Sequence, residues 1–200
     1  MRLTDRFDSA LVFAAVNHRS QKRKGGDIPY ISHLLQVSGL VLENGGNEDE
    51  AIAALLHDSM EDQDVTRDEL TANFGPVVAE IVAACSDSES SVKGPWKDRK
   101  TAYIAHIADA SPSVRLVSSC DKLHNARAIL ADYQEIGDEL WKRFNASRSE
   151  ILWYYSELAK AFEAAEVNAG EPTSRIVRQL RLVVEELNSD TGSSDADLPN

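Results

Sequence analysis

The fold of this chain is decided by residues 51–62, which read Ala51-Ile52-Ala53-Ala54-Leu55-Leu56-His57-Asp58-Ser59-Met60-Glu61-Asp62. An apolar run is followed at once by an imidazole and three carboxylates. A helix repeats every ~3.6 residues, so His57 and Glu61, like Asp58 and Asp62, are expected to lie one turn apart. Four such groups behind an apolar segment are costly to bury unless a partner neutralises them, and a divalent cation would do so.

Helical periodicity also dominates the rest of the chain, and strand-like alternation is nearly absent. Asn47 with Glu50 and Thr66 with Glu69 are typical helix starts, and Phe74-Gly75-Pro76 indicates the end of one helix and the start of the next. Helices are expected at about residues 5–19, 29–44, 47–58, 66–74, 76–85, 96–108, 111–128, 151–165 and 176–187. The pattern predicts an all-α fold in which one domain of about nine to ten helices spans residues 1–188 and a disordered polar tail spans 189–200.

Composition limits the function. A length of 200 residues suits one domain, and a formal charge of −12 argues against broad binding to nucleic acid or to an anionic membrane. An anionic ligand would need a local basic patch, and Lys22-Arg23-Lys24 supplies one. The apolar run at residues 11–16 is too short to span a bilayer. Cys85 and Cys120 form no disulfide framework or metal motif, so a cytoplasmic location is expected.

Four potential metal ligands, His33, His57, Asp58 and Asp121, fall on three separate predicted helices among apolar neighbours. Nitrogen and oxygen ligands in this mixture suit a first-row divalent metal such as manganese, iron or zinc. Each residue taken singly has another interpretation, because a lone histidine on an apolar helix is usually a hydrogen-bonded core residue. The metal hypothesis therefore depends on their combination with the flanking residues.

The combination resembles a known family. His33, His57-Asp58 and Asp121 match the H…HD…D signature of HD-domain metal-dependent phosphohydrolases, and the flanking residues resemble the hydrolase domain of RelA/SpoT-type enzymes. The matching segments are Arg23-Lys24, Pro29-Tyr30-Ile31-Ser32-His33, Ala53-Ala54-Leu55-Leu56-His57-Asp58, Glu61-Asp62, Val65-Thr66, Phe74-Gly75 and Asp121-Lys122-Leu123-His124-Asn125-Ala126-Arg127. The whole chain is thus similar to the stand-alone small alarmone hydrolases, a group that includes the metazoan SpoT homologues.

The resemblance implies an HD-type helical bundle in which His33, His57, Asp58 and Asp121 hold one metal ion, typically Mn²⁺. It implies an enzyme that removes pyrophosphate from the ribose 3′ position of guanosine tetra- and pentaphosphate, giving GDP or GTP. The substrate would then be a small nucleotide, with no nucleic acid or membrane as partner.

The resemblance also implies roles for residues around the metal. Glu61 and Asp62 correspond to the catalytic acidic pair, and Arg23, Lys24 and Asn125 correspond to residues that line the nucleotide pocket. Other cations are candidates for phosphate contacts, with a solvated helix face as the alternative for the first four: Lys93, Lys97, Arg99, Lys100 and Arg148. His18, His106 and His124 are interpreted as structural.

Three other hypotheses stay open at this point. The same chemistry could act on an adenosine alarmone or on another phosphorylated nucleotide such as NADPH, since only the base pocket discriminates. The chain could instead be a non-catalytic alarmone sensor, or a helical domain in which the four ligands are unrelated in space. The late aromatic residues fit either the core or a subunit contact, so a homo-oligomer is also open: Trp141, Phe144, Trp153, Tyr154 and Tyr155.

Overall fold

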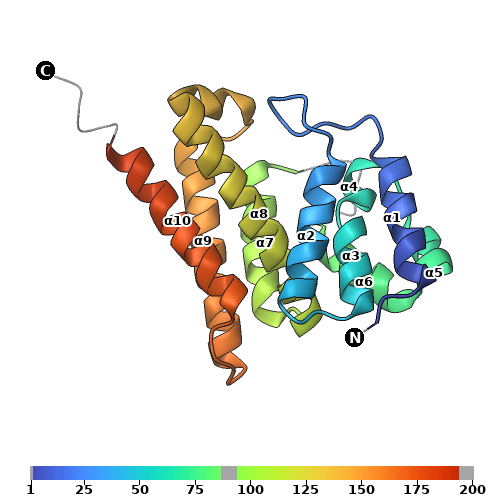
Figure 1. Ribbon diagram of the computed structural model, residues 1–200. Coiled ribbons are helices and arrows are strands. Elements are labelled where there is room, and N and C mark those ends of the chain that lie inside the picture. The colour runs from blue at the N-terminus through green and yellow to red at the C-terminus, as the bar shows by residue number, and fades with distance from the viewer. Residues whose placement is uncertain (1, 87–93, 194–200) are drawn as a thin grey trace, which may run out of the picture.

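The computed structural model describes residues 2–86 and 94–193 of the chain. Within these ranges the chain forms ten α-helices and one 3-10 helix (Figure 1). Their bounds are α1 Asp5–Asn17, α2 Ile31–Glu43, α3 Glu48–Leu56, α4 Ser59–Asp62, α5 Arg67–Phe74, α6 Pro76–Cys85, α7 Trp96–Asp109, α8 Pro112–Ile136, η1 Gly137–Arg143, α9 Arg148–Asn168 and α10 Arg175–Ser193. The predicted all-α bundle is confirmed, and the only β pairing in the described ranges is an isolated bridge between Lys22 and Pro29.

Helix α3 lies at the centre of the N-terminal half of the fold. Every residue from Glu50 to Leu56 is buried, as expected for a helix that is apolar on all sides. Helices α1, α2, α6 and α8 all pack against it, and Figure 1 shows it between α1 and α2. Since α3 is enclosed on every side, the first polar residues after Leu56 lie inside the molecule: His57 and Ser59 are buried and Asp58 is half-buried.

Helix α8 joins the two halves of the fold. It packs against α2, α3 and α6 with one side and against α9, α10 and η1 with the other, while α7 packs against α9 (Figure 1). Its N-cap Ser111 accepts a hydrogen bond from the backbone of Val114, and Pro112 occupies the first turn. Asp121 lies near its middle and is buried, so α8 carries this carboxylate to the ends of α2 and α3.

Local signals in the sequence place most helix ends. Asn47 and Glu50 form the predicted capping box, and the Thr66 side chain accepts from the backbone of Glu69. Gly75, with φ of 91°, ends α5 and is followed by Pro76 in the first turn of α6. These three boundaries agree with the prediction.

Several helix boundaries differ from the prediction: α8 continues to Ile136, beyond the expected end near residue 128, and α2 and α10 also differ. Helix α2 begins at Ile31 and does not include Pro29, which pairs with Lys22 in the isolated β bridge, while the Tyr30 N–H donates to the Gln21 carbonyl at 2.9 Å. Helix α10 continues to Ser193, whereas a disordered tail was expected from residue 189. In this last part of α10, Ser189 donates to the Glu185 carbonyl, and Thr191, which is buried, donates to the Leu187 carbonyl. Residues 194–200 lie outside the described part.

No helix in residues 2–86 and 94–193 combines the length with the hydropathy that a bilayer crossing requires.

Candidate active site

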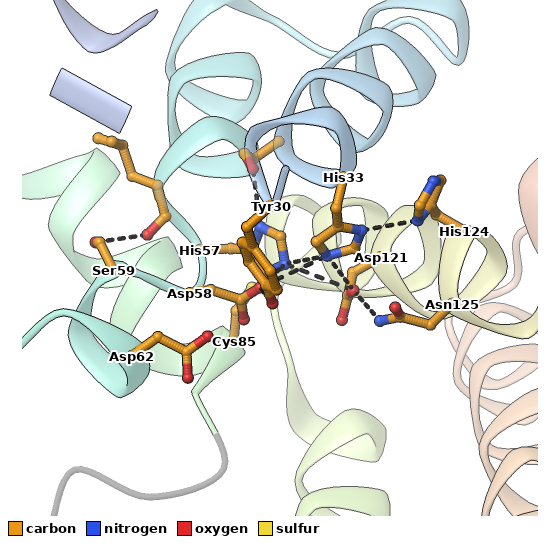
Figure 2. A network of polar contacts seen from close by, with 12 residues as sticks. Tyr30, His33, His57, Asp58, Ser59, Asp62, Cys85, Asp121, His124 and Asn125 are labelled. Carbon is orange, nitrogen blue, oxygen red and sulfur yellow. Dashed lines mark hydrogen bonds and ion pairs between the residues drawn. The ribbon is translucent and has the colours of Figure 1, made fainter. Parts of the chain in front are cut away.

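The four predicted ligands meet at one point in the structure (Figure 2). His33 lies in the first turn of α2, His57 and Asp58 form the turn between α3 and α4, and Asp121 comes from the middle of α8. The side chains of His33, His57 and Asp121 are buried, and Asp58 is half-buried. The hypothesis that these residues are unrelated in space is therefore wrong.

The spacing of the four groups fits a shared metal ion. The five distances that involve an imidazole Nε2 run from 3.1 Å, between His57 and Asp58 Oδ2, to 3.5 Å, between His57 and Asp121 Oδ1. Ligand atoms placed ~2.1 Å from one ion would lie about 3.0 Å apart at right angles and about 3.4 Å apart at tetrahedral angles. The donor set and its geometry both suit a divalent cation, and His33, His57 and Asp58 form a compact potential metal-binding group.

Hydrogen bonds on the far side of each ring direct the two histidines. Nδ1 of His57 lies 2.8 Å from the Ala54 carbonyl, which can only accept, so the other nitrogen faces the cluster. Nδ1 of His33 lies 2.7 Å from Nδ1 of His124. Burial and the neighbouring His33 lower the pKa of His124 to about 4, so His124 is neutral and can accept the His33 proton. The structural role predicted for His124 is therefore to orient His33, and its position one helical turn after Asp121 places both residues on the same side of α8.

The charges of the cluster shift the pKa values of its members in opposite directions. Burial opposes a charge on His57, yet the carboxylates of Asp58 and Asp121 raise its pKa well above the ordinary value. Burial also opposes ionisation of Asp58, but His57 and His33 hold its pKa well below the usual range. Both carboxylates are therefore favoured in the ionised form, which is the form in which a carboxylate binds a metal.

The two carboxylates have further partners that the sequence did not predict. The Tyr30 hydroxyl donates to Asp58 Oδ2 at 2.6 Å, and burial together with Asp58 raises the pKa of that tyrosine. Lys122 donates to Asp121 Oδ2 at 2.6 Å. Burial opposes ionisation of Asp121, but Lys122, His57 and His33 together hold its pKa well below its usual range. These contacts fix both carboxylates in orientation, as partners of metal ligands commonly do.

The acidic pair lies directly beside the cluster. Helix α4 begins after Asp58, and the backbone N–H of Asp62 donates to the Asp58 carbonyl at 2.9 Å, which places the two residues one turn apart as predicted. Figure 2 shows the Asp62 carboxylate close to Asp58. Oδ2 of Asp62 accepts a hydrogen bond from Gln21 Nε2 at 2.8 Å. Glu61 is half-buried in the same turn.

Part of the predicted nucleotide pocket also reaches the cluster. Arg23 Nη2 donates to Asn125 Oδ1 at 2.7 Å, and Asn125 Nδ2 donates to Asp121 Oδ1 at 2.6 Å. The Arg23 guanidinium also lies over the Tyr30 ring, 5.6 Å from its centre. Lys24 is exposed on the same loop.

The other predicted cations contact protein groups along α7, α9 and η1. Lys97 lies over the Trp153 ring at 2.8 Å, and Lys100 lies 4.9 Å from the centre of the Tyr154 ring. Arg148 forms an ion pair with Asp138 at 3.8 Å, and Arg99 donates to the Gly94 carbonyl at 3.3 Å. Lys93 falls outside the described residues. Substrate contacts by these cations stay a prediction.

The basic loop that carries Arg23 and Lys24 depends on Gly25. Its φ is 80°, and a Cβ at this position would overlap the side chain of Arg143, which is tied to Asp132 at 2.8 Å. Gly26 has an ordinary φ and open space around it.

Gly25→Ala is therefore expected to lower the free energy of unfolding by at least about 1–2 kcal/mol, the cost of the left-handed backbone alone. Urea unfolding measures the change. Gly26→Ala is the matched control and should change stability by less than about 1 kcal/mol. Equal stability of the two variants would contradict the contact between Gly25 and Arg143.

Comparison with known proteins agrees with this site. A family profile described as HD domain matches residues 10–167. The chain is 38% identical over 161 residues to the guanosine-3′,5′-bis(diphosphate) 3′-pyrophosphohydrolase MESH1 of Xenopus tropicalis, covering 76% of this chain and 85% of the relative. It is 30% identical over 175 residues to the Homo sapiens protein of the same name, covering 86% and 93%.

A solved structure shares the fold. It is described as "A metazoan ortholog of SpoT hydrolyzes ppGpp and plays a role in starvation responses" and superposes with a TM-score of 0.73 at 23% identity, covering 96% of this chain and 98% of its own. A second structure, lmo0812 from Listeria monocytogenes EGD-e, superposes with a TM-score of 0.69 at 22% identity, covering 80% and 99%. At these identities the superpositions show the fold alone.

Proposed function

We propose that this chain, which belongs to the HD-domain family and is related to the MESH1 pyrophosphohydrolases, is a nucleotide hydrolase. Its reaction would be removal of the 3′-pyrophosphate of guanosine alarmones. The products would be pyrophosphate and GDP or GTP. One observation carries the proposal: His33, His57, Asp58 and Asp121 converge, with the Glu61-Asp62 turn directly beside them. The printed activity of the relatives supports the choice of substrate.

The four converging residues would hold one divalent ion, and we propose Mn²⁺ because the set mixes imidazole with carboxylate. When bound, such an ion makes a water more acidic and draws charge from a phosphate oxygen. His124 and Tyr30 keep His33 and Asp58 turned toward it, and Lys122 holds the second oxygen of Asp121. Substrate would approach from the side of Asp58 and Asp62, since Asp58 is half-buried and Asp62 is exposed while the other three ligands are buried.

The remaining chemistry falls to the protein's own side chains. Glu61 or Asp62 would accept the proton of the attacking water or aim that water at phosphorus. Arg23 and Lys24 would bind the substrate phosphates, Arg23 with two donors and Lys24 as a point charge. A local cation pair is needed here because the chain as a whole has a formal charge of −12.

Product analysis tests the proposal directly. The purified protein is incubated with ppGpp, ppApp and NADPH side by side, each with Mn²⁺ and with a chelator. We expect release of pyrophosphate from ppGpp that the chelator abolishes and Mn²⁺ restores. Faster metal-dependent turnover of ppApp or of NADPH would move the substrate to that nucleotide. Tight binding of ppGpp without product would support a sensor instead.

The cellular setting is also part of the proposal. Cys85 and Cys120 are free thiols, which supports a reducing cytoplasm. The oligomeric state stays a prediction to be tested by light scattering.

A further inference from the structure

The side chain of Gln21 connects the end of α1 to the acidic turn of α4. Its Nε2 donates to Asp62 Oδ2 at 2.8 Å, and its Oε1 accepts from Gln63 Nε2 at 2.6 Å. The same Oε1 lies 2.6 Å from Nδ1 of His18. Because a carboxylate can only accept, the Gln21 nitrogen must face Asp62, and its oxygen is left to accept from both other residues. All polar atoms of this amide therefore have a defined role.

Neighbouring contacts hold Gln21 in one place. Its backbone N–H donates to the His18 carbonyl at 3.1 Å, and its carbonyl accepts from the Tyr30 N–H at 2.9 Å. His18 is 1% exposed, and its ring is stacked on the Tyr30 ring with centres 5.4 Å apart. The Gln21 amide is thus fixed by the buried His18 ring and by the backbone hydrogen bond between Gln21 and Tyr30.

Asp62 needs such an anchor. It is exposed and ends a helix of only four residues, so little packing restrains its rotation. A hydrogen bond to a carboxylate is stronger than one between neutral groups, and it favours one orientation of the acceptor. With Oδ2 held by Gln21, the carboxylate stays on the side of Asp58, where Figure 2 shows it.

We propose that Gln21 is a positioning residue for the reaction, and that it acts by holding the Asp62 carboxylate beside the metal cluster. The proposal rests on the proposed function, since it assigns Asp62 a role in proton transfer or water alignment. It also gives His18, which sequence analysis interpreted as structural, the task of orienting the Gln21 amide.

Two substitutions separate positioning from a structural role. Gln21→Glu keeps the size of the side chain and an oxygen that can accept from His18 and Gln63, but it replaces the donor to Asp62 with a second carboxylate oxygen. Gln21→Met keeps the size and removes all three hydrogen bonds. If Gln21 has only a structural role, Gln21→Met should lose more of the wild-type kcat than Gln21→Glu. If Gln21 positions Asp62, Gln21→Glu should lose at least as much kcat as Gln21→Met.

We expect Gln21→Glu to lower kcat about 10- to 100-fold, the range typical of partners that orient active-site groups. KM and the affinity for Mn²⁺ should change by less than about twofold. Gln134→Glu is the matched control, because Gln134 also donates to a carboxylate, that of Asp190 at 3.1 Å, at the far end of α8. It should keep wild-type kcat. Wild-type kcat in Gln21→Glu, or a loss carried entirely by KM, would overturn the inference.

A second measurement does not depend on activity. The side-chain amide resonances of Gln21 in the nitrogen–proton NMR spectrum should move in an Asp62→Ala variant and stay in place in an Asp190→Ala variant. Unmoved Gln21 resonances in Asp62→Ala would also overturn the inference. If the wild-type protein releases no pyrophosphate from any nucleotide while these resonances do move, the proposed function fails and the hydrogen bond stands.

Discussion

Asp58→Ala is expected to abolish divalent-metal binding and, with it, turnover. Asp58 Oδ2 lies 3.1 Å from Nε2 of His57 and 3.5 Å from Nε2 of His33. It is therefore one of the four proposed ligands, and without it only His33, His57 and Asp121 would remain to bind the ion. Loss of a residue that only orients a ligand commonly costs about 10- to 100-fold in metal affinity. Loss of a ligand itself should cost at least about 100-fold, and kcat should fall with occupancy.

Thermal unfolding in the presence and absence of Mn²⁺ measures this loss without any substrate. A ligand that binds only the folded state raises the free energy of unfolding by about 2.7 kcal/mol at a concentration 100 times its Kd. The wild-type protein should therefore melt at a higher temperature when Mn²⁺ is added, and Asp58→Ala should not respond at the same concentration. Metal analysis after dialysis gives the stoichiometry.

Glu80→Ala is the control for Asp58→Ala, since it removes an exposed carboxylate from α6 and should keep both the metal response and turnover. An Asp58→Ala variant that binds Mn²⁺ with wild-type affinity would contradict the assignment of Asp58 as a ligand. An Asp58→Ala variant that loses turnover while keeping the metal would indicate that Asp58 contacts the substrate or transfers a proton and does not bind the metal.

Local chemistry explains why most of the fold was predictable. Helix starts at Asn47, Thr66 and Ser111 depend on side-chain caps and neighbours three residues away, and such signals can be seen in sequence. The continuation of α10 through Ser189 and Thr191 was missed, because hydroxyl groups that bond to the preceding turn are as compatible with a loop as with a helix. The 3-10 helix η1 carried no periodic signal.

The metal cluster was predictable for a different reason. His57 and Asp58 adjoin an apolar run, but nothing in spacing alone brings His33 or Asp121 to them; the resemblance to the HD family supplied that link. The partners of these ligands could not be predicted, because they depend on how helices cross. The contact between His33 and His124 joins residues 91 positions apart, and the contact between Gln21 and Asp62 joins residues 41 apart.

The double variant Glu61→Ala/Asp62→Ala is expected to keep the metal and lose turnover. The hydrogen bond of Asp62 goes to Gln21, and the distances that define the cluster involve neither acidic residue. Mn²⁺ affinity should therefore change by less than about twofold, while kcat should fall about 10²- to 10⁴-fold, the usual contribution of a positioned acid or base. Each single variant should lose less, since the neighbouring carboxylate can take part of the role.

Calorimetric Mn²⁺ titration and initial rates on ppGpp, measured on the same preparations, separate these two effects. Glu185→Ala/Glu186→Ala is the control, because it removes an adjacent pair of exposed carboxylates from α10 and changes the net charge by the same amount. A Glu61→Ala/Asp62→Ala variant at wild-type kcat would remove both acids from the mechanism. Proton transfer would then have to go to bulk water or to a substrate phosphate, and the hydrogen bond from Gln21 to Asp62 would have no part in catalysis.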